Sequence, residues 1–237
     1  MQQPAAITLA RCAPDDMLSA RTCGVAGPMY KYLMRPHAEA LKGRGLIRIG
    51  TLYEFRAFEK FNEAVGDSSE GLQVFNTWKQ MAGLGASSVA RRFGARFHNV
   101  AANVSGPTFA GEEHSLDYYL YCVTHSPSPR AMRRFGYDTC VLISEPDRFV
   151  GAVTDILLRT PVIDAYDLQA VDYSGNTFDE KPRHPNDTAP WRTKRPLYAY
   201  QAEARCRWSP VWRDGTRARQ LPLIEVAALR GLVQILE

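Results

Sequence analysis

The sequence predicts an α+β protein with a curved, mostly antiparallel β-sheet and a few short helices. Many short apolar segments are separated by glycine, proline or polar residues, whereas few segments have the spacing of an amphipathic helix. The chain has 237 residues, of which 45% are hydrophobic and 23% are charged, a composition typical of folded proteins and not of disordered ones. Because no apolar stretch approaches the roughly 18 residues of a transmembrane helix, we expect no membrane association.

The chain is expected to consist of an irregular N-terminal extension, residues 1–28, followed by a single domain, residues 29–237. The extension has no sustained periodicity, and Gly27 and Pro28 mark its end. It also lacks the basic start and long apolar core of a secretion signal, so the expected location is the cytoplasm.

The domain is predicted to begin with a strand, a short helix and a second strand. Met29–Leu33 has the composition of a strand, and Pro36 stands where a helix begins, with Gly45 as its stop signal. Leu46–Phe55 is the predicted second strand, and it carries Thr51 and Tyr53 on or just after it.

Residues 79–114 are predicted to form a long flexible insertion. This segment is rich in Gly, Ala, Ser and Asn, and neither strand nor helix periodicity holds in it for long, although a helix near Ser87–Phe93 is compatible with the pattern. Loops of this length within a compact domain are usually functional or mobile.

The second half alternates between short strands and one clear helix. Pro146–Leu158 has the apolar spacing of an amphipathic helix, and Ser174–Pro196 is polar and rich in proline, hence a loop. The remaining predicted strands are Tyr118–His125, Thr139–Ser144, Leu168–Tyr173, Leu221–Val226 and Leu232–Leu236.

The segment Leu197–Trp208, LYAYQAEARCRW, is the most informative part of the chain. As a strand it would turn its aromatic and small residues to the core and its polar residues to the opposite face. A polar face in the middle of a β-rich domain must be hydrated, paired or directed at a ligand. The residues on that face are Gln201, Glu203, Arg205 and Arg207.

Five segments occur in an order that resembles a bacterial domain family of uncharacterised function. That family opens with a Tyr-Lys-Tyr strand and closes with an aromatic-x-x-Glu/Gln-x-Glu-x-Arg strand. The resemblance covers about Met29 to Leu236, and this chain differs from the family in having Leu33 where Arg is frequent and Gln201 where Glu is frequent. The segments are MYKYL, LIRIGTLYEFR, GDSSEG, YYLYCVTHS and RPLYAYQAEARCRW.

The same order is similar to that of a divergent ADP-ribosyltransferase, which implies a split sheet and NAD as substrate. In that superfamily the first strand carries a basic residue, the second a small hydroxyl residue and a late strand Gln/Glu-x-Glu. By position, Lys31 or Tyr30 would take the first role and Thr51 the second. Gln201-x-Glu203 would take the third, with the last glutamate holding the nicotinamide-ribose hydroxyl and the residue two before it orienting the acceptor.

The residue types are compatible with this chemistry. Cleavage of the bond from ribose C1′ to nicotinamide develops positive charge on the ribose, which a fixed carboxylate such as Glu203 stabilises. A cation among Lys31, Arg48 and Arg56 could hold the pyrophosphate, and a tyrosine among Tyr30, Tyr32 and Tyr53 could stack on a base. Arg205 would neighbour the catalytic glutamate in the site.

The expected function is therefore that of an NAD-dependent ADP-ribosyltransferase or NAD glycohydrolase, as toxins and phage-defence enzymes are. Its partners would be NAD, a protein or nucleic acid as acceptor, and a protein that neutralises it. No metal is expected in this reading, because the cysteines and histidines show no ligand spacing.

Two alternatives remain open from the sequence. The first is a non-catalytic module that binds nucleic acid or protein through the basic loop with Arg91, Arg92 and Arg96, although the net charge of the chain is only +4. The second is a metal-dependent nuclease that uses Asp67, Glu70 and Glu203.

Overall fold

The computed structural model of the chain describes residues 22–23, 27–56, 71–77, 109–159, 163–175, 177–178, 190–210, 218 and 220–236. Of the predicted extension, the structure describes residues 27–28 and the two-residue strand β1, Thr22–Cys23. Most of the predicted insertion, including Arg91, Arg92 and Arg96, lies outside the described residues.

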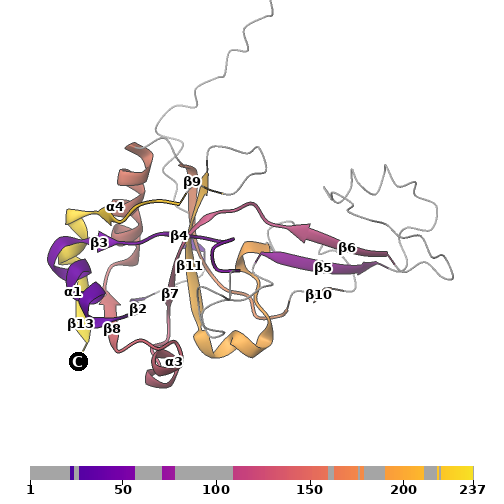
Figure 1. Cartoon of the computed structure of the whole chain (residues 1–237), viewed down its shortest axis with the longest axis horizontal. Coiled ribbons are helices and arrows are strands. Elements are labelled where there is room, and N and C mark those ends of the chain that lie inside the picture. The colour runs from indigo at the N-terminus through magenta and orange to yellow at the C-terminus, as the bar shows by residue number, and fades with distance from the viewer. Residues whose placement is uncertain are drawn as a thin grey trace, which may run out of the picture.

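The architecture is α+β and is dominated by a mostly antiparallel sheet (Figure 1). Within the described residues this sheet has eight strands, in the order β1-β9-β11-β7-β2-β8-β13, and β4 also pairs with β7. In the described part of this sheet β1 and β9 pair in parallel and the other pairs are antiparallel. The strands other than β1 are β2 (Met29–Leu33), β4 (Gly50–Thr51), β7 (Tyr119–Thr124), β8 (Thr139–Ile143), β9 (Ile163–Ala170), β11 (Glu203–Pro210) and β13 (Val233–Leu236).

Two smaller sheets accompany the main one. The first pairs β10 with β5 and β5 with β6, and Figure 1 shows β5 and β6 running away from the main sheet. The second pairs β12 with β3. Their strands are β3 (Leu46–Ile47), β5 (Leu72–Thr77), β6 (Phe109–His114), β10 (Thr177–Phe178) and β12 (Ile224–Glu225).

The helices are short, and their ends follow local sequence signals. Helix α1 has a proline in its first turn and ends at Gly45, which adopts the left-handed conformation at φ 70°. No helix in the part of the chain that the structure describes is long and apolar enough to cross a membrane. The helices are α1 (Arg35–Arg44), α3 (Pro129–Arg134), α4 (Pro146–Arg159) and the 3₁₀ helices η2 (Pro190–Arg192), η3 (Pro196–Gln201) and η4 (Ala227–Gly231).

The main core lies between the sheet and the helices α1 and α4. Burial of Phe149, Val153 and Leu157 on one face of α4 explains its apolar spacing. Trp208 of β11 is fully buried in this core, and its indole N–H donates to Thr154 Oγ1 of α4 at 2.8 Å. This bond fixes the strand that carries Glu203 against the opposite layer.

Several sequence predictions are confirmed. Strand β2 and helices α1 and α4 lie where the periodicity and the stop signals place them, and β7, β8 and β13 match the predicted strands to within a few residues. Alternation along β11 is also confirmed, because Ala204, Cys206 and Trp208 all join the core. These segments share a feature: their own residues signal them, either by an apolar pattern or by a proline or glycine at the end of the element.

Other predictions are wrong in part. The predicted strand Leu197–Trp208 begins as the 3₁₀ helix η3, and Ala202, at φ 44°, separates that helix from β11. The predicted strand Leu46–Phe55 is broken into β3, β4 and a turn. Finally, the end of the predicted insertion forms β6, which pairs with β5 along its whole length.

Candidate functional site

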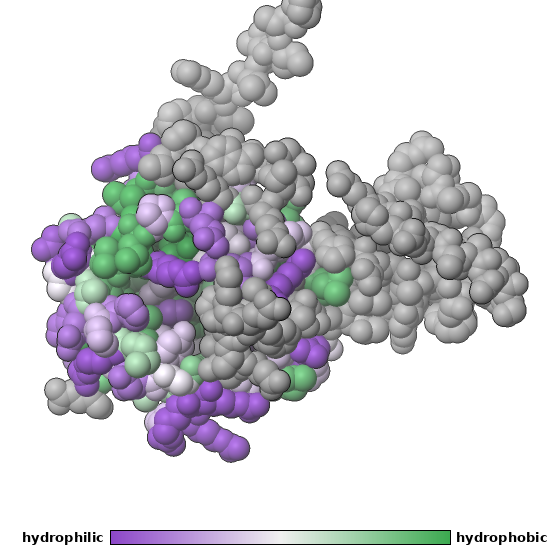
Figure 2. All heavy atoms as spheres, viewed as in Figure 1, coloured by the Kyte–Doolittle hydropathy of each residue, from purple (hydrophilic) through white to green (hydrophobic). Residues whose placement is uncertain are grey.

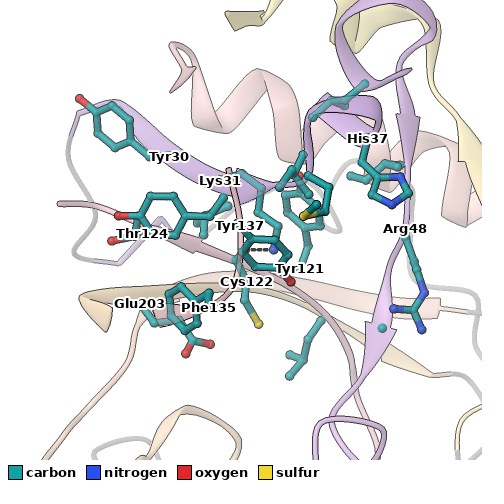
Figure 3. Close-up of a pocket in the computed structure, with 18 of the residues that line it drawn as sticks. Tyr30, Lys31, His37, Arg48, Tyr121, Cys122, Thr124, Phe135, Tyr137 and Glu203 are labelled. Atoms are coloured by element: carbon teal, nitrogen blue, oxygen red, sulfur yellow. Dashed lines mark hydrogen bonds between the residues drawn. The ribbon is translucent and has the colours of Figure 1, made fainter. Parts of the chain in front are cut away.

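A cavity of about 370 Å³ opens beside β7, where the main sheet divides. This volume is within the range of small-molecule sites. Its walls come from β2, α1, the β3–β4 segment and β7, and residues after α3 and around the start of β11 close it (Figure 3). Figure 3 shows polar groups at its two ends, Glu203, Thr124 and Tyr30 at one and His37 and Arg48 at the other.

The division of the sheet follows from the strand registers. Strand β2 pairs with β7 at Tyr30 and Thr124, whereas β4 pairs with the same edge of β7 at Leu120 and Tyr119. Between these two contacts the Cys122 carbonyl accepts a hydrogen bond from Lys31 Nζ at 2.7 Å. A side-chain ammonium thus bonds to the strand edge where the two flanking strands diverge.

Glu203, the first residue of β11, lies at one end of the cavity with its carboxylate between two cations. Oε2 accepts from Lys194 Nζ at 2.6 Å, and Oε1 accepts from Arg205 Nε at 2.7 Å. All three side chains are less than one-tenth exposed. The three residues form a buried charge cluster, hereafter the Glu203 cluster.

Further contacts fix the members of the Glu203 cluster. Lys194 Nζ also donates to Gln201 Oε1 at 2.8 Å, so one ammonium bonds to both polar residues of the Gln-x-Glu motif. Arg205 Nη1 donates to the Trp191 carbonyl. The Glu203 backbone N–H donates to the Tyr173 hydroxyl at 2.8 Å. Each charge therefore has defined partners, which a buried ion group needs to be tolerated.

The charges of the Glu203 cluster determine its protonation. Burial raises the pKa of the Glu203 carboxyl, but the Arg205 guanidinium and the Lys194 ammonium together outweigh burial and hold the pKa well below its usual value. Glu203 is therefore a carboxylate at every physiological pH. Burial, together with the negative charge of Glu203, raises the pKa of the nearby Tyr173 phenol, so that tyrosine stays neutral.

Lys31 also lines the cavity and differs from Lys194 in its partners. Its ammonium bonds to the Cys122 carbonyl and lies 4.9 Å from the centroid of the Tyr121 ring. Among the residues that the structure describes, no carboxylate forms an ion pair with it. A half-buried cation at a cavity wall, whose described contacts are a carbonyl oxygen and an aromatic ring, favours an anionic ligand.

Aromatic side chains supply much of the remaining wall. Tyr30, Phe55, Phe135 and Tyr137 all line the cavity. The turn after β4 brings Phe55 back against Gly50, where an added Cβ would meet the Phe55 ring at 2.9 Å. A glycine at this position thus lets the ring close this side of the cavity, and the aromatic walls suit a planar ring system in the ligand.

Six of the residues singled out from the sequence line this cavity: Tyr30, Lys31, Tyr32, Arg48, Gln201 and Glu203. Arg205 does not line the cavity but supports Glu203 from behind. The structure thus brings together the first strand and the Gln-x-Glu motif, although the motif starts on η3 and not on the strand.

Thr51 and Tyr53 lie away from the cavity and stabilise the turn after β4. Thr51 Oγ1 accepts from the Glu54 backbone N–H at 3.1 Å. The Tyr53 backbone N–H donates to Asp117 at 2.8 Å, and its hydroxyl donates to the Ser115 carbonyl. Asp117 is 4% exposed, and burial raises its pKa although the hydrogen bond from the Tyr53 backbone N–H lowers it. Both residues shape the wall at Phe55 without facing the cavity.

Sequence reasoning missed Lys194, because it lies in a proline-rich segment with no periodicity. Its backbone N–H donates to the Asp172 carbonyl at 2.9 Å, and the neighbouring Thr193 forms an isolated bridge with Asp172. These long-range contacts place the lysine, and no local signal in the sequence indicates them.

Most of the residues on which the two alternative functions depend lie outside the residues that the structure describes. Asp67 and Glu70, like the arginines of the basic loop, lie outside the described residues. Among the residues that are described, no group of three or more His, Cys, Asp and Glu side chains is arranged to hold a metal ion.

Comparison of the chain with models of protein families, with curated proteins and with solved structures found no match. What can be inferred about the cavity therefore rests on its own residues: an ionised, buried carboxylate, a lysine with neutral neighbours, and aromatic walls.

Proposed function

We propose that the cavity binds NAD and that the protein is an NAD-consuming ADP-ribosyltransferase or NAD glycohydrolase. The observation that carries this proposal is that Glu203 and Lys31, far apart in the sequence, line the same cavity. The aromatic walls would hold the nicotinamide ring, and Lys31 would contact the pyrophosphate. A cavity of about 370 Å³ suits one half of a dinucleotide, and the other half would extend past the exposed rim residues Met34 and Leu223.

In the proposed reaction, the bond between ribose C1′ and the nicotinamide nitrogen breaks, and its electron pair leaves with nicotinamide. Water or a nucleophile of the acceptor then bonds to C1′ and loses its proton to solvent. Glu203 supports the cationic transition state because its carboxylate is ionised and its partners hold it in one place. Its depressed pKa makes it a poor proton acceptor, so its role is electrostatic.

Lys194 has a specific part in this proposal. Two cations around one carboxylate leave the Glu203 cluster with a net positive charge, which opposes a developing cation nearby. Lys194 lines the cavity whereas Arg205 does not, so a phosphate that enters can attract the Lys194 ammonium. The Glu203 carboxylate would then be free to face the ribose only when the substrate is bound.

The experiment is incubation of the full-length protein with NAD and measurement of nicotinamide release by chromatography. We expect release by the wild type and a loss of at least about a hundredfold in Glu203→Gln. The matched control is Glu225→Gln, which removes an exposed carboxylate that pairs with Arg44. Thermal melting of each variant shows whether it is folded.

Two results would remove the proposal. One is the absence of both NAD binding by calorimetry and nicotinamide release by the folded wild-type protein. The other is an undiminished rate in folded Glu203→Gln. Equal losses in Glu203→Gln and Glu225→Gln would likewise show that the effect does not come from the cavity.

A further inference from the structure

Helix α3 presents three arginines on one exposed face. Arg130, Arg133 and Arg134 are spaced at i, i+3 and i+4, which places them side by side on a helix, and all three are exposed. Ala131 is buried on the opposite side. In Figure 2 hydrophilic side chains project from the lower edge of the molecule, where Figure 1 places α3. These three residues are hereafter the α3 arginine face.

This arrangement disfavours the helix by itself. Like charges at these spacings repel each other. Arg133 and Arg134 lie in the last turn, where the helix dipole favours cations, but Arg130 lies in the first turn, where the dipole opposes them, and that turn contains no acidic residue. Within the described residues none of the three forms an ion pair. Within the described residues, no carboxylate therefore offsets the repulsion between Arg130 and the other two arginines.

The helix is nevertheless firmly anchored. The Ser128 side chain caps it by accepting from the Ala131 N–H at 3.2 Å, and the Ser128 N–H donates to the Tyr32 hydroxyl at 2.6 Å. Phe135, just after the helix, packs on the Tyr32 ring with centroids 5.8 Å apart. The backbone of the α3 arginine face is thus held in place, so the helix need not be ordered first when a ligand binds.

The platform adjoins the cavity. Phe135 and Tyr137, which follow α3, line the cavity wall. The Arg134 guanidinium lies 4.4 Å from the centroid of the Tyr200 ring, on the 3₁₀ helix that ends at Gln201. An extended ligand that binds to the α3 arginine face would therefore pass close to the cavity.

We propose that the α3 arginine face binds the sugar–phosphate backbone of a single-stranded nucleic acid. Guanidinium groups bind phosphate oxygens through two parallel hydrogen bonds, and a nucleic acid offers such an anion at every nucleotide. The three arginines are closely spaced and have no acidic residue between them. They therefore suit the regularly repeated phosphates of a nucleic acid better than the sparse carboxylates on the surface of a folded protein. The inference goes beyond the proposed NAD chemistry and does not depend on it.

The test uses the full-length protein without NAD. A fluorescently labelled single-stranded oligonucleotide of mixed sequence is titrated at several concentrations of NaCl between about 50 and 200 mM, and the dissociation constant is followed by anisotropy. The variant Arg130→Gln/Arg133→Gln/Arg134→Gln is compared with Arg44→Gln/Arg148→Gln/Arg159→Gln. The second variant removes the same number of exposed positive charges from α1 and α4. Thermal melting confirms that both are folded.

We expect at least tenfold weaker binding at low salt for the α3 variant and a near-wild-type value for the control. The salt slope, log Kd against log [NaCl], should fall by about 2 for the α3 variant, since each phosphate contact on a single strand contributes about 0.7. Equal losses in the two variants would show an effect of net charge and overturn the proposal, as would salt-independent or undetectable binding by the wild type. Competition by polyglutamate as strong as by unlabelled oligonucleotide would favour an acidic protein partner and also overturn it. Nicotinamide release is measured in a separate assay, so a failure of nucleic-acid binding and a failure of the NAD proposal can be told apart.

Discussion

Replacing Lys194 by methionine removes the ammonium that joins Glu203 to Gln201 and keeps most of the aliphatic side chain. Two buried acceptors lose a donor: Glu203 Oε2, at 2.6 Å, and Gln201 Oε1, at 2.8 Å. A buried polar atom without a partner costs about 1–3 kcal/mol, which gives about 2–6 kcal/mol for the two. Because Arg205 still compensates the carboxylate, we expect about 3 kcal/mol less free energy of unfolding at pH 7.

The assay is urea-induced unfolding, followed by tryptophan fluorescence, for Lys194→Met, Glu203→Gln and the double variant. The two changes should not be additive, because each removes the same buried ion pair, and we expect a coupling energy of about 2 kcal/mol. The matched control is Arg44→Met, in which an exposed pair with Glu225 is lost and a change of less than about 1 kcal/mol is expected.

The dependence on pH gives a second test of the same cluster. Because the folded protein holds the pKa of Glu203 below its usual value of 4.5, the unfolded chain binds the extra proton first as the pH falls. The stability that Glu203 contributes is therefore fully present above about pH 5 and is lost progressively below that. The difference in unfolding free energy between wild type and Glu203→Gln should shrink as the pH decreases through this range.

Two outcomes would refute this reasoning. Additive changes, with a coupling energy below about 0.5 kcal/mol, would mean that Lys194 and Glu203 do not interact in the folded protein. A difference between wild type and Glu203→Gln that stays constant from neutral pH to about pH 3 would mean that the pKa of Glu203 is not depressed.

Three further outcomes are expected. Lys31→Met should weaken NAD binding by about tenfold in calorimetry and change the maximal rate of nicotinamide release little. The reason is that the lost charge contacts the pyrophosphate equally before and during the reaction. An unchanged affinity would contradict this prediction. Thr51→Ala should cost about 1 kcal/mol of unfolding free energy, since the Glu54 N–H loses one of its two acceptors and buried Asp117 loses its bond to the Thr51 side chain, and should leave NAD turnover unaltered. The Cys122 thiol, whose pKa burial raises, should react with iodoacetamide at pH 8 far more slowly than a free thiol, as mass spectrometry can follow, whereas rapid labelling would show an open site.

The parts of the fold that sequence reasoning predicted are those that short-range signals determine. Gly45 ends α1 because it adopts the left-handed backbone conformation that glycine tolerates, and the same signal is visible in the sequence. The core positions of β11 followed from alternation, because Ala204, Cys206 and Trp208 are all apolar or small. No contact with a distant segment is needed to infer either feature.

The parts that were missed depend on contacts between distant segments. Strand β6, FAGEEH, has no apolar alternation and is a strand because it pairs with β5. Ala202 has no special sequence signal, yet its positive φ separates η3 from β11 and lets Gln201 and Glu203 meet the same ammonium. Alternation predicted that these two polar residues share a surface, but it could not indicate which cation would join them.

The charges around the cavity limit what it can bind. At the end of an apolar cavity, the Glu203 carboxyl would become protonated unless cations compensated its negative charge. The two cations are Arg205, from the same strand, and Lys194, from a segment with no periodic pattern. With Lys31 and Arg48 also lining the cavity, the described groups carry four positive charges, against the negative charges of Glu203 and of Glu54, which pairs with Arg48. A ligand that brings only a cationic ring would therefore be repelled. A ligand that carries phosphate groups as well can neutralise the lysines, so the pyrophosphate of NAD, more than its nicotinamide, would determine the affinity.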